Sequence, residues 1–276
     1  MRIETTGLLY PAPLGAPLTP QTPPPSTDGP AAMDGDIHPA VDALPLRGRR
    51  EYAQLCLLRD DFAACLAVVN GMELGVFIRR ARLFAFYGQR APRLEVRPLR
   101  LDGSVRLAEA IPSVLPHQNT ALLLSAVTFP DTPPGIYRTN LEMEGEGGVT
   151  YLPVAVEVAG VTAPPVETRT GPALTDPLDI LFSAAGDGPF LLPEAEGYAG
   201  VLYRAALADR RLFAAARAAD PLLTDTLLAS LRAVRTHCED DADLLRKIRR
   251  TLVHRLDGRF AAGNREPLYA PGDKPA

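Results

Sequence analysis

The chain has 276 residues, of which 46% are hydrophobic and 22% charged, so it is not a wholly disordered protein. Its formal net charge of −4 excludes an overall positive field that would attract nucleic acid or anionic lipid. The N-terminus lacks the basic start and apolar stretch of a signal peptide, and no apolar run is long enough to span a membrane. We therefore expect a cytoplasmic protein without a membrane span.

The cysteines and arginines carry little functional information. Cys56, Cys65 and Cys238 form no CxxC pair and are odd in number, which disfavours a secreted disulfide framework. Cys56 and Cys65 lie in apolar runs where a free cysteine behaves as a small hydrophobic residue, and a bridge between them is the alternative. Only Lys247 and Lys274 are lysines among 29 cationic residues, and such a strong preference for arginine is typical of a GC-rich genome. Clusters of arginine are therefore weak evidence for a binding site in this chain.

Residues 1–46 are predicted to be a strand-like peptide followed by a disordered, proline-rich linker. The first ten residues are apolar and β-prone, whereas residues 11–46 contain ten prolines, which block helix and ladder hydrogen bonds. The peptide either frays or adds as a strand to a sheet edge of this chain or of a partner. The candidate partner-binding residues in it are Ile3, Leu8, Leu9 and Tyr10.

Residues 47–160 have the pattern of short strands separated by turns. The clearest feature is a hairpin from Tyr137 to Val158, in which two alternating strands flank a glycine-rich turn. Pro98 marks an edge strand or a bulge, and that edge is a possible acceptor for the N-terminal peptide. Asn70-Gly71 and Asp60-Asp61 are turn signals. Further strands are expected at 52–58, 65–69, 75–78, 83–87, 93–101, 105–108 and 121–129.

Seven or eight short strands without intervening helices predict an antiparallel β-sandwich of the immunoglobulin-like kind. Tyr137, two residues after a Pro-Gly turn, is similar to the start of a late strand in such folds, although this likeness identifies no family. A fragment spanning 47–160 is expected to give a β spectrum and to melt cooperatively. The fold class predicted for the whole chain is α+β, mainly β.

Residues 161–176 are predicted to be a linker, and residues 177–260 a helical domain. Beyond residue 195 the apolar residues recur at helical spacing, which predicts three amphipathic helices. Asp220-Pro221 starts the second helix, and Gly258 ends the third. The helices either close a small bundle or pack on the sandwich. Residues 261–276 are expected to be a flexible tail.

The sequence predicts no metal site and no cofactor. The four histidines are scattered, and only Cys238 beside His237, with acidic residues nearby, resembles a local ligand set. Those acidic residues are better explained by the positive end of the third helix dipole.

One spacing resembles a known active site. Arg232 precedes His237 with four residues between them, and Arg249 precedes His254 in the same way. This pattern on a helix resembles the motif of the HEPN helical ribonucleases, and the resemblance covers only these two stretches. It implies that the arginine stabilises charge on the scissile phosphate while the histidine transfers a proton. The residue after the arginine is usually polar in that family, and Ala233 departs from this.

The sequence favours a non-enzymatic interaction, scaffold or assembly component. We expect it to dock a protein partner or a second copy through the sandwich edge, the N-terminal peptide or the C-terminal helices. A basic stretch on the third helix is either a solvated face or a contact for an acidic partner; its candidate contacts are Arg246, Arg249 and Arg250. Nucleic acid is not the expected partner. The alternatives are a ligand-sensing sandwich and the ribonuclease.

Overall fold

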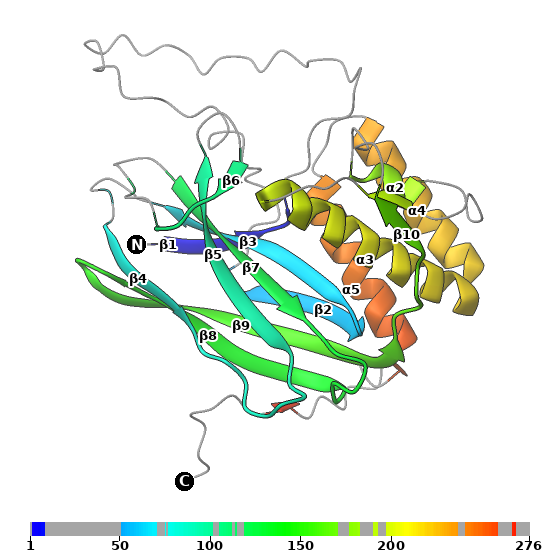
Figure 1. The fold of residues 1–276 in the computed structure, drawn as a ribbon, viewed down its shortest axis with the longest axis horizontal. Helices are drawn as coiled ribbons and strands as arrows, with labels where there is room; N and C mark the ends of the chain where they lie inside the picture. Colours follow the sequence, from blue (N-terminus) through cyan, green and yellow to red (C-terminus); the bar gives the residue numbers. More distant parts are fainter. Residues whose placement is uncertain are drawn as a thin grey trace.

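Two five-stranded β-sheets, one two-stranded sheet and three long helices make up the described part of the chain, as a computed structural model shows (Figure 1). The fold is therefore α+β with more strand than helix, as predicted. The linker expected at 11–46 lies outside the described residues. The structure describes residues 2–8, 51–70, 75, 77–101, 105–111, 114, 119–170, 177–182, 190–192, 197–236, 241–258 and 267–268.

The first sheet has the strand order β1-β3-β7-β5-β6, and all its neighbouring strands are antiparallel. Its central strand β7 is apolar on both faces because Leu122 and Leu124 pack towards the second sheet, whereas Leu123 packs towards a helix. The strands of this sheet are β1 (Arg2–Thr6), β3 (Phe62–Asn70), β5 (Arg93–Leu101), β6 (Val105–Leu107) and β7 (Asn119–Val127).

The second sheet has the order β12-β8-β9-β2, with β4 pairing with another stretch of β8. The β8–β9 hairpin joins Tyr137 to Val156 in antiparallel register, as the alternation predicts, whereas β2 and β9 are parallel. Its strands are β2 (Ala53–Arg59), β4 (Ile78–Leu83), β8 (Gly135–Gly145), β9 (Gly148–Thr162) and β12 (Pro267–Leu268). A separate parallel pair consists of β10 (Thr168–Thr170) and β11 (Phe190–Leu192).

Three details of the strand region differ from expectation. The strands expected at 75–78 and 83–87 are wrong, because β4 spans Ile78–Leu83 and lies between the two expected ranges. The Asn70-Gly71 signal does not close a hairpin, because β3 and β4 belong to different sheets. Cys56 and Cys65 are both buried and free, so the alternative of a bridge between them is also wrong.

The helices pack on the sandwich and do not form a separate bundle. Leu58 of β2 and Ile136 of β8 share one core cluster with Leu212, Leu231 and Leu252 of the helices. The helices are α2 (Asp179–Phe182), α3 (Gly197–Ala219), α4 (Pro221–Thr236) and α5 (Asp241–Leu256).

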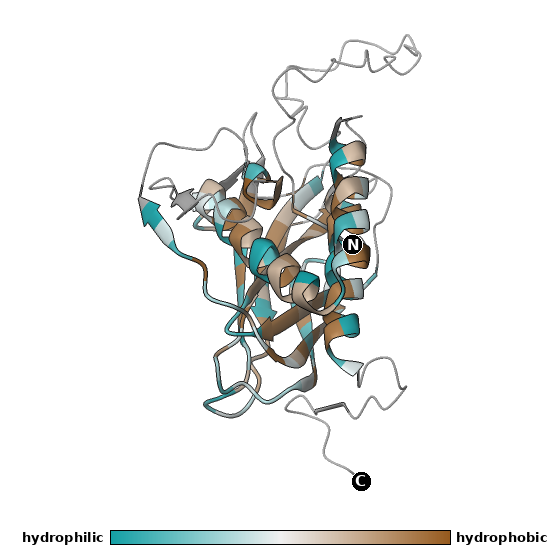
Figure 2. Cartoon of the chain, turned by 90° about the vertical axis from the view of Figure 1, so that its right-hand side faces the viewer, coloured by the Kyte–Doolittle hydropathy of each residue, from teal (hydrophilic) through white to brown (hydrophobic). Residues whose placement is uncertain are grey.

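The helical residues alternate between hydrophilic and hydrophobic, as expected for helices that lie between solvent and a core (Figure 2). Asp220 caps α4 as predicted, since its carboxylate accepts a hydrogen bond from the Leu223 N–H at 3.2 Å. In the part of the chain that the structure describes, no helix combines the length and the apolar character that crossing a membrane would need.

Candidate functional site

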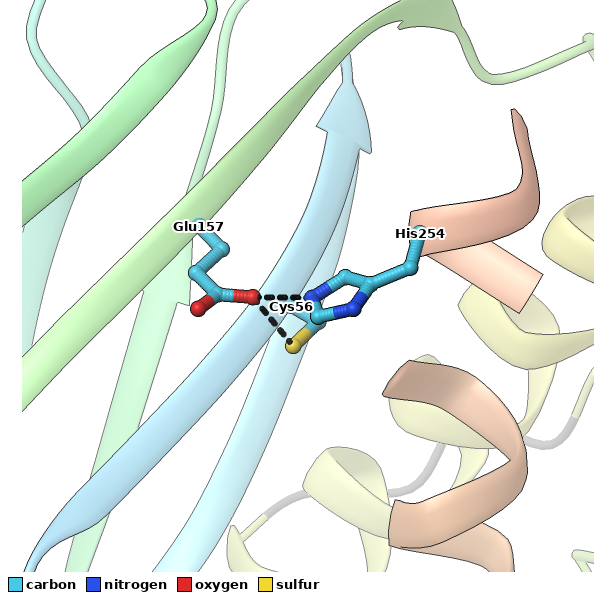
Figure 3. Close-up of side chains that lie close together, drawn as sticks. All are labelled: Cys56, Glu157 and His254. Carbon is cyan, nitrogen blue, oxygen red and sulfur yellow. Dashed lines mark hydrogen bonds and ion pairs between the residues drawn. The ribbon is translucent and has the colours of Figure 1, made fainter. Parts of the chain in front are cut away.

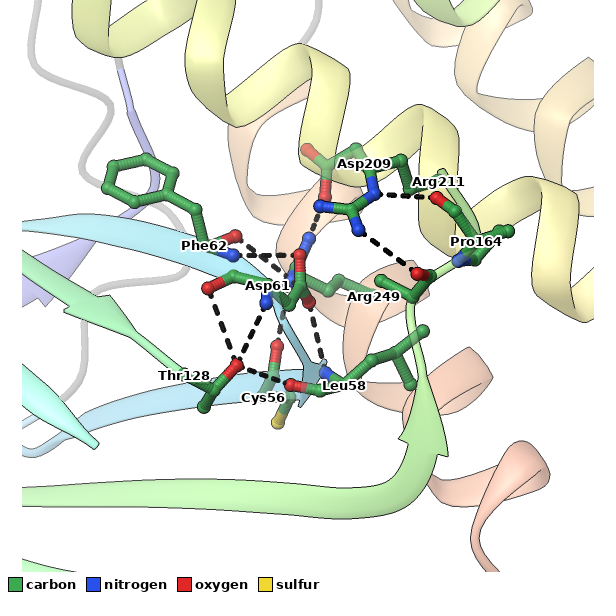
Figure 4. A network of polar contacts seen from close by, with 10 residues as sticks. Cys56, Leu58, Asp61, Phe62, Thr128, Pro164, Asp209, Arg211 and Arg249 are labelled. Atoms are coloured by element: carbon green, nitrogen blue, oxygen red, sulfur yellow. Dashed lines mark hydrogen bonds and ion pairs between the residues drawn. The ribbon is translucent and has the colours of Figure 1, made fainter. Parts of the chain in front are cut away.

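A buried arginine, Arg249, lies on the sandwich side of α5 and is 9% exposed. Its guanidinium forms ion pairs with Asp61, in the turn between β2 and β3, and with Asp209 of α3. It also donates hydrogen bonds to the carbonyl oxygens of Cys56 at 2.6 Å and Phe62 at 3.1 Å (Figure 4). One side chain therefore links α5 to α3 and to both sheets.

Two buried carboxylates share this single cation. Burial raises the pKa of Asp61, and it raises the pKa of Asp209 to about 6, although Arg249 opposes both shifts. Burial alone would lower the pKa of Arg249, but the two carboxylates raise it above its ordinary value. Asp61 also accepts hydrogen bonds from the N–H groups of Leu58 at 3.0 Å and Phe62 at 2.8 Å, so its carboxylate fixes the turn as well.

A second polar cluster lies under α5 and joins Cys56, Glu157 and His254 (Figure 3). Cys56 on β2 and Glu157 on β9 are cross-strand partners, and His254 reaches them from α5. Oε2 of Glu157 lies 2.5 Å from Nε2 of His254 and 3.5 Å from Sγ of Cys56. Gln54 donates a hydrogen bond to the other oxygen of Glu157 at 2.9 Å, which fixes the orientation of the carboxylate.

The cluster has the residue types of a nucleophilic triad but not its arrangement. Burial raises the pKa of the Cys56 thiol, and the charge of Glu157 raises it further. The thiol therefore remains protonated at neutral pH and donates to Glu157. A catalytic cysteine instead needs an imidazole or another group that favours its thiolate. The three side chains are better suited to holding a cation.

A small cavity of about 60 Å³ lies between α5 and the sheets, beside both clusters. It has room for a few water molecules but not for a drug-sized ligand. Its polar and sulfur-containing lining includes Gln54, Cys56, Cys65, Asp209 and Arg249.

The N-terminal peptide is docked on its own chain. β1 pairs antiparallel with β3, with Ile3 opposite Val69, and the hydroxyl of Thr5 donates to the carbonyl of Tyr52 at 2.6 Å. Ile3 and Leu8 are 6% and 5% exposed and belong to the protein core. The acceptor is therefore β3, and the suggested acceptor edge near Pro98 of β5 is wrong. Leu9 and Tyr10 lie outside the described residues.

The predicted basic stretch of α5 is not a uniform solvated face. Arg249 is buried, which corrects its placement on the surface. Arg246 and Lys247 both form ion pairs with Asp243, and Arg250 is half-buried. Most of the positive charge on this stretch of α5 is thus already balanced by acidic residues of the same chain.

The two motifs that resemble HEPN ribonucleases do not converge in the described residues. Arg232 donates to the carbonyl of Phe182 at 3.2 Å and stacks 5.0 Å from the centre of its ring. Arg249 and His254 are engaged with the acidic partners described above, and a phosphate would have to displace those partners. His237 lies outside the described residues.

An exposed apolar row lies on β9, on the outward face of the second sheet. Val149 and Tyr151 are 49% and 56% exposed, and Pro153 continues the row. Glu144 and Glu142 of β8 are their cross-strand partners, and Arg80 of the neighbouring β4 lies 3.4 Å from each glutamate. We call Val149, Tyr151 and Pro153, together with Arg80, Glu142 and Glu144, the β9 face.

The polar residues that meet beneath α5 include several that the sequence did not single out for binding or catalysis. The alternation of the hairpin places Glu157 on the outward side of its strand, and Asp61 belongs to a predicted turn. Gln54 and Asp209 carry no motif. A partial signal exists for Arg249, which lies four residues after Leu245 and three before Leu252, on the apolar stripe of its helix.

Comparisons with known proteins identify no family. No model of a known protein family matches the chain. No curated protein matches it. Among solved structures, the chain is similar to a family 123 glycoside hydrolase from Clostridium perfringens, described in a study of glycolipid glycan hydrolysis, with 12% identity and a TM-score of 0.29. The match covers 40% of this chain and 23% of that chain, so this chain spans less than a quarter of that structure.

Proposed function

We propose that this protein is a non-enzymatic interaction or assembly component that docks a protein partner or a second copy through the β9 face. The observation that carries the proposal is the exposed row of Val149 and Tyr151 at alternate positions of one strand. Single exposed apolar residues are normal on protein surfaces, whereas aligned ones are typical of interaction sites. Tyrosine is also enriched at the centres of interfaces.

The charged groups beside this row would supply specificity. Arg80 is 56% exposed and shared between Glu142 and Glu144, so both signs of charge lie next to the apolar row. A partner with a complementary pattern would align on these charges, and like charges would repel other surfaces. Within the described residues, β4 pairs only with β8, so its outer edge could also accept a strand.

The test is a double substitution in the row, Val149→Ser with Tyr151→Ser. Size-exclusion chromatography with light scattering measures self-association, and a pull-down from source lysate measures partner binding. We expect the double variant to lose the association, whereas Leu222→Ser, which changes an apolar residue that is 80% exposed on α4, should retain it. A strictly monomeric wild-type protein that captures no partner would contradict the proposal.

We also infer that the sandwich is immunoglobulin-like. The order β1-β3-β7-β5 corresponds to strands A-B-E-D of that fold, and β4-β8-β9 corresponds to C-F-G. The hydroxyl of Tyr137, near the start of β8, donates to the carbonyl of Pro133 at 2.7 Å. This contact corresponds to the tyrosine corner at the start of strand F, and it supports the inference.

A groove favours a second candidate function, that of a ligand-sensing sandwich. It has a volume of about 520 Å³ and is lined by residues of β4, in the second sheet, and of β5, in the first. This volume suits a small organic ligand. Val96→Phe would fill part of the groove, so a ligand found by thermal-shift screening should lose its effect in that variant. The apolar lining is Phe77, Ile78, Ala81, Val96, Pro98, Ala110, Ile111 and Leu122.

A further inference from the structure

A divalent metal site of the zinc type is the further function that we propose for Cys56, Glu157 and His254. The three side chains come from β2, β9 and α5, which are far apart in the sequence, and their ligand atoms all lie within 4.8 Å of one another. A thiolate, a carboxylate and an imidazole are the ligands that Zn²⁺ takes in proteins. The site is independent of the β9 face.

The distances suit a tetrahedral ion after a small movement. With Zn–S near 2.3 Å and Zn–N or Zn–O near 2.0 Å, the ligand atoms lie roughly 3.3–3.5 Å apart. Sγ of Cys56 and Oε2 of Glu157 are already 3.5 Å apart. Nε2 of His254 lies 2.5 Å from the same oxygen, so the imidazole must retreat by about 0.8 Å to admit the ion.

The surroundings supply the outer contacts that a metal site needs. Gln54 holds Oε1 of Glu157 at 2.9 Å and leaves Oε2 for a single bond to the ion. When the ion binds, the Cys56 thiol releases its proton to solvent. Nε2 of His254 also gives up the proton that it donates to Glu157, and the neutral ring then carries its single proton on Nδ1. One dication with one thiolate and one carboxylate is then neutral, so the site buries no net charge.

The site is accessible to solvent on one side and is enclosed by the second sheet and α5 on the others. The side chain of His254 is 20% exposed, whereas that of Glu157 is 4% exposed, so the ion would enter past the imidazole. Three protein ligands leave the fourth tetrahedral position to water. Because two ligands belong to the second sheet and one to α5, occupancy would clamp that helix onto the sandwich.

The experiment uses the full chain after treatment with a chelator. Zn²⁺ is titrated in competition with a chelating dye, and Co²⁺ is added separately to report thiolate coordination through its charge-transfer band. We expect one ion per chain, a thiolate band with Co²⁺, and a higher melting temperature with Zn²⁺. Cys56→Ser should remove the band, and Glu157→Gln and His254→Gln should each weaken Zn²⁺ binding at least tenfold.

Matched variants separate this site from other ligands. Cys65→Ser and Cys238→Ser change the other two cysteines and should preserve both the band and the affinity. Gln54→Leu removes only the outer contact and should weaken binding about tenfold. Circular dichroism tests whether each variant is folded. If Cys56→Ser does not fold, the loss of Zn²⁺ affinity in Glu157→Gln becomes the test of the site. Absence of binding, or a cobalt–thiolate band that survives in folded Cys56→Ser, would overturn the proposal.

Discussion

Arg249 is the residue whose replacement should cost the most stability. Arg249→Met keeps much of the side-chain volume but leaves Asp61 and Asp209 buried without their cation. Breaking a buried ion pair in this way costs about 3–5 kcal/mol. We expect the melting temperature to fall by roughly 6–20 °C, measured by circular dichroism. The control is Arg250→Met, which changes the adjacent, half-buried arginine. It should change the free energy of unfolding by about 0.5 kcal/mol or less.

Asp209 should make stability depend on pH in the opposite direction to most carboxylates. Its folded-state pKa of about 6 exceeds its ordinary value of 3.8, so the folded protein binds more protons between these pH values. The stability contribution is therefore present at about pH 4 and is lost as the pH rises through 6, by on the order of 2–3 kcal/mol.

Asp209→Asn isolates this effect because asparagine does not titrate. Urea unfolding of both proteins at several pH values gives the difference in free energy of unfolding. We expect that difference to shift in favour of the variant as the pH rises from 4 to 7. A difference that stays constant over this range would show that Asp209 ionises normally in the folded protein.

At the residue scale, the sequence could predict which strand positions face outward but not what would cover them. The alternation of β9 puts Glu157 on the outward face, beside Tyr151 and Ala155. The structure covers that end of the face with α5, so Glu157 is buried while Tyr151 remains exposed. Because the covering helix lies about a hundred residues further along the chain, no local pattern distinguishes the two positions.

At the scale of elements, the N-terminal strand should contribute to stability rather than only to association. A Cβ atom added to Gly7 would lie 2.5 Å from the carbonyl oxygen of Ala242, so Gly7→Ala must push β1 away from α5. Such crowding costs about 1–3 kcal/mol, which should lower the melting temperature by several degrees. Gly147→Ala is the matched control, since nothing lies within 4 Å of its added atom.

Deletion of residues 1–8 extends this test. It removes Ile3 and Leu8 from the core, each worth about 1.5–3 kcal/mol, and exposes the edge of β3. We expect a lower melting temperature and some aggregation, both seen in a thermal scan with light scattering. A deletion variant that melts like the full chain would mean that β1 is not docked in solution.

Elements with a strong period were predictable, and those defined by distant pairing were not. The hairpin from Tyr137 to Val158 and the strand at 93–101 follow from alternation and turn chemistry alone. The sequence could also suggest that the first residues form a strand, but not that β3 accepts it, since edge choice depends on the completed sheet. The position of β4 could not be predicted for the same reason, because its bounds are set by its pairing with β8.

At the scale of the molecule, the sequence left open whether the helices stand alone or pack on the sandwich. In the structure the helices pack on the sandwich, because the apolar surface of the second sheet needs to be covered. Leu58 and Ile136 point out of the second sheet and would be exposed without α3 and α5. A bundle of this size also has too little core of its own. Sandwich and helices therefore depend on each other for burial.

This dependence predicts that the full chain unfolds in one transition. Differential scanning calorimetry should give a calorimetric enthalpy equal to the van't Hoff enthalpy, as for a single cooperative unit. A fragment spanning 47–160 lacks both β1 and the helices, so it exposes the apolar faces around Leu58 and Leu66. We expect that fragment to aggregate or to melt without a sharp transition, in contrast to the cooperative melt that its strand pattern alone predicts. Two separate transitions in the full chain, or a cooperative melt of the fragment, would show that the sandwich folds without its helices.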